Sequence, residues 1–334
     1  MPYPFRFQPL FRRYLWGGRR LNTVLRKSIG SGDDYAESWE IADHGTDQSI
    51  VINGPRKGQS LHDLVKDLGP QLLGNAWHER IHANGIPCNL HGRFPLMLKF
   101  LDAWLPLSVQ VHPEDKMASK LTTPDLGKSE AWYVLYADEN SRVYAGLHRN
   151  IQRPQLSRAI STGSIESALH SFVPRTGDCI FIPAGTVHAI GGDLLIAEIQ
   201  QASDTTFRLF DWNRVDSTGV PRELHVAQAL EAIDFKRGPV QPVRPQSGEH
   251  PHAQRLVACD KFVMSRWTIN QPVTFGVDQK MRILLMISGA LELEHPQSHE
   301  SLRLGHCVLL PAEGAPSQLR PAPQAVFLEF HLPE

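Results

Sequence analysis

Four side chains of this sequence are suited to hold a transition metal together: Gln110, His112, Glu130 and His188. The stretch 107–113 alternates like a short β-strand that ends at a proline, which places Gln110 and His112 on one face. Burying an amide and an imidazole on a strand face costs free energy unless something binds them. Two imidazoles, a carboxylate and an amide oxygen suit a divalent transition metal, with zinc as the first choice.

His188 ends a stretch whose spacing resembles the second motif of the cupin fold. Gly177 is followed by five residues, Pro183, one residue, Gly185, two residues and His188. Because glycine supplies a positive φ and proline a fixed one, the stretch predicts a hairpin with His188 early on its second strand. A single histidine on a strand is more often a hydrogen-bonded core or surface residue than a ligand. The two stretches together favour the metal site.

Composition limits the class of protein. The chain has 334 residues, which makes two domains the natural expectation, and its 25 glycines and 25 prolines suggest the many turns of an all-β fold. The net charge of −1 gives no reason to expect nucleic acid or an anionic membrane as a partner. The four cysteines form no CxxC pair, and no apolar run resembles a signal peptide or a membrane span, so we expect a cytoplasmic protein.

Pattern changes along the chain predict how it is divided. Residues 1–236 read as a β domain with a helical insert near 60–83, where Ser60 has the character of an N-cap. Residues 237–254 are rich in proline and polar side chains and read as a linker or a covering strand, and 255–334 read as a smaller β domain.

A second hairpin predicts that the C-terminal domain repeats the first. The stretch 305–311 has the Gly-five-Pro spacing of 177–183, but no histidine follows at the position that corresponds to His188. We therefore expect a mainly β protein made of two cupin (jelly-roll) barrels, with helical insertions in the N-terminal half and no metal in the second barrel. Chance similarity of two hairpins is the alternative.

Further charged residues lie on predicted strands that could face the metal site. Lys99 lies in the apolar strand 94–101, where it is either a snorkelling lysine at an edge or a cation facing the site. Glu198 points inward on the strand after His188. Arg208 lies on the next strand, where taken alone it would be interpreted as the partner of Asp204 or Asp211.

At this point the chain resembles the class I mannose-6-phosphate isomerases of the short bacterial type. The matching stretches follow the family's order over most of residues 5–215, and they are specific as a set, although no single one is. They are Trp16–Gly18, Glu37–Glu40, Pro95–Phe100, Leu107–Glu114, Gly127–Glu130, Gly177–His188 and Glu198–Trp212.

The resemblance implies roles for individual residues. In that family zinc is held by the residues that match Gln110, His112, Glu130 and His188, so one Zn²⁺ per chain is expected. A glutamine takes the place of the first histidine of the usual cupin motif in this family, as Gln110 does here. The resemblance also implies that the position of Arg208 is essential and that the position of Lys128 belongs to the substrate site. Lys99 and Ser108 are assigned to the substrate site with them.

The implied reaction interconverts mannose 6-phosphate and fructose 6-phosphate through an enediol. Moving a proton between C1 and C2 needs a Lewis acid on the two oxygens, a base, and stabilisation of developing negative charge. We favour Glu198 as the base, with water or one of the histidines as alternatives. Lys128, Arg208 and Lys99 are the candidate cations for the phosphate. The partner is thus a phosphorylated hexose, and the protein is expected to be a monomer or a homodimer.

Two other functions fit part of the pattern. Two histidines and one carboxylate are also the facial triad of non-haem iron oxygenases, which would leave out a fourth ligand and a phosphate site. A sugar-binding cupin that has lost catalysis is the third interpretation. Gln110, Lys128 and Arg208 favour the isomerase over both.

Overall fold

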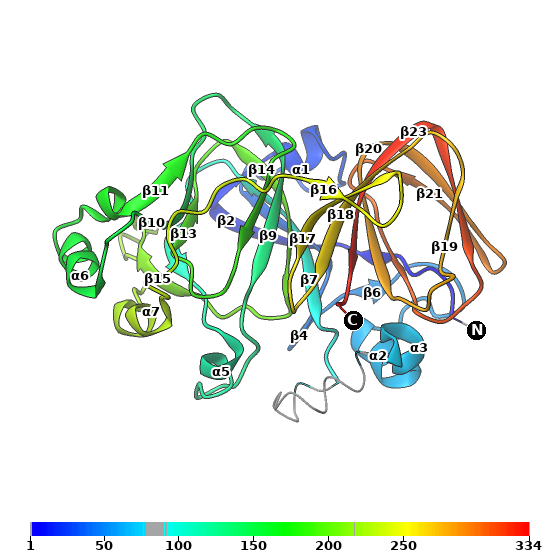
Figure 1. The fold of residues 1–334 in the computed structure, drawn as a ribbon, viewed down its shortest axis with the longest axis horizontal. Helices are drawn as coiled ribbons and strands as arrows, with labels where there is room; N and C mark the ends of the chain where they lie inside the picture. The colour runs from blue at the N-terminus through cyan, green and yellow to red at the C-terminus, as the bar shows by residue number, and fades with distance from the viewer. Residues whose placement is uncertain (1, 76, 78–89, 91, 217, 334) are drawn as a thin grey trace.

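The computed structural model describes residues 2–333, apart from 76, 78–89, 91 and 217. The described chain is mainly β, as predicted, and its strands form two sheets in the N-terminal part and one in the C-terminal part (Figure 1). In the part that the structure describes, no helix has the length and apolar character needed to cross a membrane.

The N-terminal part contains a six-stranded and a five-stranded sheet, in which all neighbouring strands are antiparallel. In spatial order the six-stranded sheet contains β12 (Cys179–Ile182), β9 (Glu130–Ala137), β14 (Leu194–Gln201), β7 (Leu96–Ala103), β3 (Tyr35–Ile41) and β2 (Leu10–Gly18). The five-stranded sheet contains β11 (Leu169–Phe172), β10 (Val143–Leu147), β13 (His188–Ile190), β8 (Val109–Val111) and β15 (Phe207–Phe210).

The C-terminal part forms one eight-stranded antiparallel sheet. Its main path is β16 (Gln246–Ser247), β17 (Ala253–Ala258), β18 (Val263–Ile269), β23 (Ser317–His331), β20 (Arg282–His295) and β21 (Ser298–Arg303), with β19 (Val273–Phe275) paired to β23 and β22 (Cys307–Leu310) paired to β20. Two short pairs complete the strands: β1 (Phe7–Gln8) with β6 (Ile50–Val51), and β4 (Asp43–His44) with β5 (Asp47–Gln48).

Short helices cover the sheets. They are α1 (Arg20–Thr23), α2 (Leu61–Leu68), α3 (Pro70–Leu73), α5 (Asp115–Ala118), α6 (Arg153–Ser161), the 3₁₀ helix η2 (Ile165–Ala168) and α7 (Val226–Ala232). Ser60 caps α2 as predicted, since its side chain accepts a hydrogen bond from the backbone N–H of Asp63. Residues 78–83 of the predicted helical insert lie outside the described residues.

Alternation along the strands gives the six-stranded sheet two buried faces. Ala131 and Tyr133 of β9 belong to a large apolar cluster that also contains residues of α2, α3 and the C-terminal sheet. Trp132 and Val134 point the other way, into a cluster shared with the five-stranded sheet. The α6 and α7 helices pack on the outer face of the five-stranded sheet, away from the C-terminal sheet (Figure 1).

The two larger sheets share one succession of strands. The path β12–β9–β14–β7–β3–β2 has its counterpart in β22–β20–β23–β18–β17–β16. The registers correspond too, because Glu130 lies opposite Ile182 in β12 while Arg282 lies opposite Leu310 in β22. The stretches 177–183 and 305–311, which have the same glycine–proline spacing, thus contain β12 and β22, which hold corresponding places in their sheets.

The stretch 177–188 forms the predicted strand, turn and strand, but the two strands do not pair as a hairpin, because β12 belongs to the six-stranded sheet and β13 to the five-stranded sheet. Gly185 lies in its turn with φ of +84°, and its backbone N–H donates a 2.8 Å hydrogen bond to the carbonyl oxygen of His112. The turn thereby connects the segment that carries His188 to the segment that carries His112.

We expect Gly185→Ala to lower the free energy of unfolding by about 1–3 kcal/mol, because a side chain at this φ is strained. A Cβ at this position would also lie 3.2 Å from the carbonyl oxygen of Ala232. Gly163→Ala is the matched control, since its φ of +69° is similar but nothing lies within 4 Å of the added Cβ. Urea unfolding should give the larger loss for Gly185→Ala, and equal losses would contradict a role for the crowded turn.

Candidate active site

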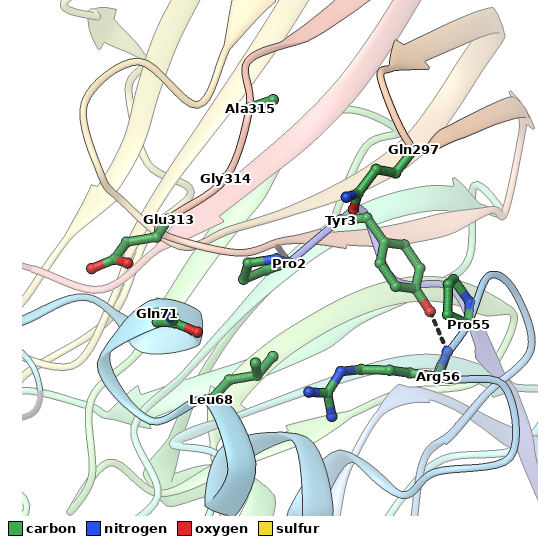
Figure 2. A pocket seen from close by; sticks show the side chains of 10 residues that line it. All are labelled: Pro2, Tyr3, Pro55, Arg56, Leu68, Gln71, Gln297, Glu313, Gly314 and Ala315. Carbon is green, nitrogen blue, oxygen red and sulfur yellow. Dashed lines mark hydrogen bonds between the residues drawn. The ribbon is translucent and has the colours of Figure 1, made fainter.

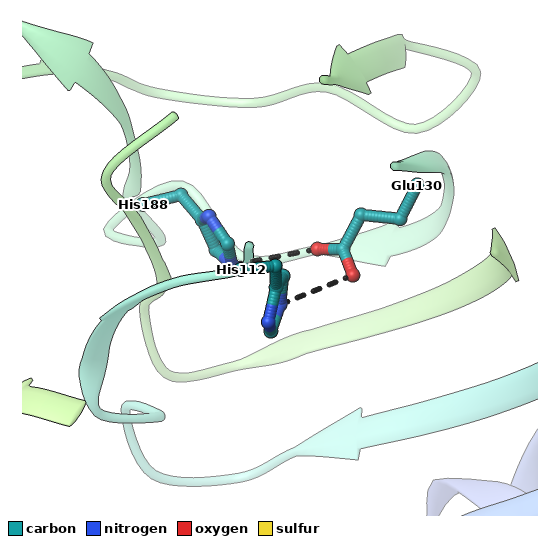
Figure 3. Close-up of side chains that lie close together, drawn as sticks. All are labelled: His112, Glu130 and His188. Carbon is teal, nitrogen blue, oxygen red and sulfur yellow. Dashed lines mark ion pairs between the residues drawn. The ribbon is translucent and has the colours of Figure 1, made fainter. Parts of the chain in front are cut away.

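Three of the predicted metal ligands converge between the two N-terminal sheets. His112 directly follows β8, while Glu130 and His188 are the first residues of β9 and β13. One ligand atom from each lies within 4.8 Å of the other two, and all three residues are buried (Figure 3). The Nε2 atoms of His112 and His188 lie 3.4 Å from Oε2 and Oε1 of Glu130, respectively.

Backbone carbonyls orient both imidazoles. Nδ1 of His112 lies 3.0 Å from the carbonyl oxygen of Thr205, and Nδ1 of His188 lies 2.9 Å from that of Thr186. A carbonyl can only accept, so each Nδ1 carries the proton and each Nε2 presents its lone pair to the cluster. This is the outer hydrogen bond that metal-binding histidines usually make.

Two atoms of the cluster are buried without a hydrogen-bond partner: Nε2 of His112 and Oε2 of Glu130. They are 3.4 Å apart, but their contact lacks hydrogen-bond geometry. Orphaned buried polar atoms are rare and costly in folded proteins. An imidazole lone pair and a carboxylate oxygen facing the same point are the donors that a divalent cation requires, so the residues present fit a metal ion.

The charges around the cluster favour the protonation states that a metal needs. Burial lowers the pKa of His112, with Lys128 contributing, and lowers the pKa of His188 to about 4. Burial alone would raise the pKa of Glu130, but the ammonium of Lys128, 3.3 Å from Oε2, and the two histidines lower it below its usual range. Neutral imidazoles and an ionised carboxylate are the metal-binding forms.

Gln110 lies beside the cluster with its amide turned the other way. Its Nε2 lies 3.2 Å from Nε2 of His188, and its Oε1 accepts a 3.2 Å hydrogen bond from the hydroxyl of Ser108. Binding a metal through the amide oxygen therefore requires a flip of this side chain. Amide orientation is an assignment from the hydrogen-bond network, so the flip is a small change.

A cavity of about 310 Å³ opens in front of the cluster, within the usual range of small-molecule sites. Every substrate-site or catalytic residue predicted from the sequence lines it: Lys99, Ser108, Lys128, Glu198 and Arg208. Gln110 and Glu130 also line it, which places two of the predicted metal ligands at its wall.

Lys99 is a cavity residue and not a snorkelling lysine at a sheet edge. It lies on β7, which has β14 and β3 on either side, and it is only 3% exposed. Its ammonium lies 4.3 Å from the ring centroid of Trp39, 3.8 Å from Glu37 and 3.9 Å from Asp204. These contacts compensate the buried charge. Because no hydrogen bond to the ammonium of Lys99 is found within the described chain, its N–H groups are available to a ligand.

Arg208 reaches the same cavity from β15, directly opposite Gln110 of β8. It forms no ion pair with Asp204 or Asp211 in the described chain, so the interpretation as a structural ion pair is wrong. Its NH1 donates to the carbonyl oxygen of Glu223, 2.7 Å away, and its buried Nε has no partner. Burial, followed by the charge of Arg222, lowers the pKa of Arg208.

Glu198 lies deep in the cavity on β14, opposite both Trp132 of β9 and Lys99 of β7. Its Oε2 accepts a 3.0 Å hydrogen bond from the indole N–H of Trp132. Burial and the charge of Glu130 raise the pKa of Glu198 to about 7. A carboxyl group that titrates near neutral pH beside a candidate metal site has the property expected of an acid–base residue.

Several cavity residues were not predicted from the sequence. Arg222 lines the cavity from the loop before α7, and its guanidinium donates to Asp211. Tyr14 and Trp16 stack at 5.6 Å on another wall. The arginine lies in an irregular loop, where no periodicity indicates the direction of a side chain; the two aromatics share a face of β2, which strand alternation could have revealed.

A larger cavity, of about 780 Å³, lies between the start of the chain, α2, α3 and the turns of the C-terminal sheet (Figure 2). Its charged lining residues are Arg56 and Glu313, and the hydroxyl of Tyr3 accepts a hydrogen bond from the backbone N–H of Arg56. None of its lining residues belongs to the cluster of His112, Glu130 and His188. Size alone therefore does not make it the candidate active site.

Comparison with known proteins identifies relatives of this chain. The family model described as "Phosphomannose isomerase type I, catalytic domain" matches residues 4–144. Mannose-6-phosphate isomerase ManA of Bacillus subtilis (strain 168) is 32% identical over 314 residues, which cover 92% of this chain and 93% of that protein. Mannose-6-phosphate isomerase of Streptococcus mutans serotype c is 30% identical over 311 residues, covering 93% of each.

The fold agrees as well. The crystal structure of the mannose 6-phosphate isomerase from Bacillus subtilis superposes with a TM-score of 0.86 at 28% identity, covering 99% of this chain and 100% of that one. Similarity at this level over almost the whole length, together with the predicted motifs in their predicted places, shows the relationship. The chain therefore belongs to the type I phosphomannose isomerase family.

Proposed function

We propose that this isomerase interconverts mannose 6-phosphate and fructose 6-phosphate through an enediol, with one divalent metal ion, zinc by preference, at His112, Glu130, His188 and Gln110. The observation that carries the proposal is the buried His–Glu–His cluster, with its two orphaned donor atoms, at the wall of a cavity lined by cations. The curated relatives with this name make the same reaction the natural choice for the chain.

The metal, when bound, would supply Lewis-acid polarisation of the sugar oxygens at C1 and C2 without changing its oxidation state. The chain's own residues would do the rest. Gln110 would turn its amide oxygen toward the metal after the hydrogen bond from the Ser108 hydroxyl to this oxygen breaks. Lys128, whose pKa is raised above its usual range by Glu130 and Glu198 despite the opposing effect of burial, stays protonated and can hydrogen-bond a developing oxyanion.

Proton transfer between C1 and C2 is assigned to Glu198. Its carboxyl lines the cavity and is held by the indole of Trp132, so its position is fixed before substrate enters. With a pKa of about 7, it can take the carbon-bound proton from one carbon and return it to the other near neutral pH. The histidines are weaker candidates, because both imidazoles direct their lone pairs at the metal position. Water is the remaining alternative.

The phosphate is assigned to the side of the cavity where Arg208 and Arg222 lie. Both guanidinium groups line the cavity, and the Nε of Arg208 has no partner in the described chain. A planar fork of N–H donors suits a phosphate better than an ammonium does. Lys99 is assigned to the sugar hydroxyls, because its ammonium lies on the strand beside Glu198.

The alternatives account for fewer observations. An iron oxygenase would use the same two histidines and Glu130, but it gives no role to the cationic lining of the cavity. A binding protein without catalysis gives no role to a glutamate whose pKa is raised to about 7. Membership of an isomerase family argues against both.

We also propose that the chain folds as two cupin-type barrels, residues 1–236 and 255–334, and that the second holds no metal. The shared succession of strands supports the repeat. Arg282 occupies the place of Glu130 in the second unit, and it pairs with Glu329 at 2.6 Å and with Asp278. A guanidinium in place of a carboxylate ligand repels a cation. The cytoplasmic location and the monomeric or dimeric state remain predictions from the sequence.

The purified protein should carry about one divalent metal per chain, and His112→Ala and His188→Ala should each lose it, because a zinc site rarely survives removal of a ligand. His170→Ala is the control, since this histidine lies on the edge strand β11, contacts Gln241 and does not line the cavity, so this variant should retain full loading. Metal analysis after gel filtration measures all three. Full loading of both ligand variants would place the metal elsewhere, and two ions per chain would contradict the metal-free C-terminal part.

Arg208→Ala should keep the fold and the metal but lower turnover of mannose 6-phosphate by roughly a hundredfold or more, the scale of removing one oxyanion donor. Arg208→Lys should restore little, because an ammonium lacks the fork geometry. Arg237→Ala is the control, because Arg237 is a partly buried arginine outside the cavity whose Nε forms an ion pair with Asp234 at 3.3 Å. Near-normal turnover in Arg208→Ala would leave Arg208 with a structural role only.

The pH dependence of kcat/KM should follow Glu198. Its pKa is raised to about 7, so the carboxyl is protonated below this pH, and only the ionised form can accept a proton from carbon. Activity should therefore rise as the pH increases through about 7. In Glu198→Gln this rise should disappear and turnover should fall by roughly 100-fold or more. An unchanged pH profile in the variant would assign the base to another group.

A further inference from the structure

Asp125 is a buried carboxylate outside the cavity that binds an unusual number of donors. It lies in the loop before β9, and its side chain is 10% exposed. Oδ1 accepts a 2.7 Å hydrogen bond from NH1 of Arg93. Oδ2 accepts from the hydroxyls of Ser203 and Thr205, at 2.9 and 3.0 Å. The backbone N–H of Asp204 at 3.4 Å and Nε2 of His44 at 3.5 Å also face Oδ2.

These donors fix the turn 202–205 between β14 and β15. Arg93 supports the same turn a second time, because its NH1 also donates to the carbonyl oxygen of Ala202 at 2.9 Å. Burial would raise the pKa of Asp125, but the hydrogen bonds from His44, Ser203 and Arg93 lower it below its usual range. The group is therefore ionised at neutral pH, and its hydrogen bonds are the stronger, charge-assisted kind.

The turn held by Asp125 is the turn that orients His112. The carbonyl oxygen of Thr205 accepts the hydrogen bond from Nδ1 of His112, and the hydroxyl of Thr206 lies 3.5 Å from the same nitrogen. His188 differs, because its Nδ1 contacts the carbonyl of Thr186 in the turn just before β13. His188 is therefore oriented by its own segment, whereas His112 depends on a turn that is far away in sequence.

We infer that Asp125 is a positioning residue for the metal site: by anchoring the turn 202–205 it fixes the Thr205 carbonyl, which selects the tautomer and the ring orientation of His112. The inference rests on the proposed metal site, and it assigns no direct contact between Asp125 and the metal or the substrate. Outer hydrogen bonds of this kind typically contribute 10–100-fold to metal affinity. Asp125 also lies in the loop that leads into β9, whose first residue is Glu130.

The test measures zinc affinity and not turnover. Asp125→Asn keeps the size of the side chain but turns an amide group toward donors, so the turn should loosen. The metal is removed from the protein with a chelator, and Zn²⁺ is titrated back in competition with a chromophoric chelator. We expect the dissociation constant for Zn²⁺ to rise about 10–100-fold in Asp125→Asn. In ¹⁵N-labelled protein the Nδ1–H signal of His112, assigned by its absence in His112→Ala, should broaden or shift while that of His188 remains.

Two further variants keep the test decisive where Asp125→Asn does not fold. Thr205→Val and Ser203→Ala each remove one hydroxyl that donates to Asp125 but keep the backbone carbonyl, and each should raise the dissociation constant by about threefold to tenfold. Asp43→Asn is the control, since Asp43 is equally buried and accepts from Gln48 and the backbone N–H of Phe94. It should lower stability without changing zinc affinity.

The outcomes are distinct. Unchanged zinc affinity and an unchanged His112 signal in the folded variants, with only lower stability, would reduce Asp125 to a structural residue and overturn the inference. A loss of affinity as large in Asp43→Asn as in Thr205→Val would overturn it too. Failure of the unaltered chain to bind zinc would overturn the proposed metal site, and this inference with it.

Discussion

The site depends on the burial of one carboxylate. Glu130 is 1% exposed, and an ionised carboxylate at such a position is costly unless neighbours compensate it. Lys128 and two imidazoles surround it, but one of its oxygens still has no hydrogen-bond partner. The surrounding residues therefore compensate the charge of Glu130 with ion pairs but leave the hydrogen bonding of its carboxylate incomplete. Sites built to receive a cation have this property, and it explains why so many neighbouring groups have shifted pKa values.

Strand register supplies the geometry. Gln110 of β8 has His188 of β13 on one side and Arg208 of β15 on the other, so three site residues form a row across the five-stranded sheet. In the facing sheet, Glu198 of β14 lies between Trp132 of β9 and Lys99 of β7. Because side chains alternate strictly along strands, a shift of one residue would move a whole row out of the cavity. The buried apolar side chains on the outer face of the five-stranded sheet oppose such shifts.

Most of the site residues predicted from the sequence lie on strands, and two of those that were missed lie in loops. The candidate ligands were predicted because strand alternation and the glycine–proline spacing of the stretch 177–188 indicate where side chains point, and His112, Glu130 and His188 do form a cluster. Arg222 and Asp125 lie in irregular segments, where no period relates spacing to direction. That Arg282 lies opposite Leu310 could not be predicted, because the register between two strands does not follow from the residue pattern of either strand alone. The sequence left two interpretations of Lys99 equal: a snorkelling lysine at a sheet edge and a cation facing the site. Its burial on a strand between two others favours the second.

The large apolar cluster has a consequence for how this chain can change. Leu98, Phe100 and Tyr133 of the six-stranded sheet belong to the same buried cluster as Met264, Leu285 and Phe330 of the C-terminal sheet. Each such side chain contributes about 1.5–3 kcal/mol when removed from water, so separating the two sheets would expose far more apolar surface than a marginally stable fold tolerates. The two parts should therefore melt in one cooperative transition. The C-terminal part therefore cannot be deleted without exposing the apolar face of the sheet that carries Glu130 and Glu198.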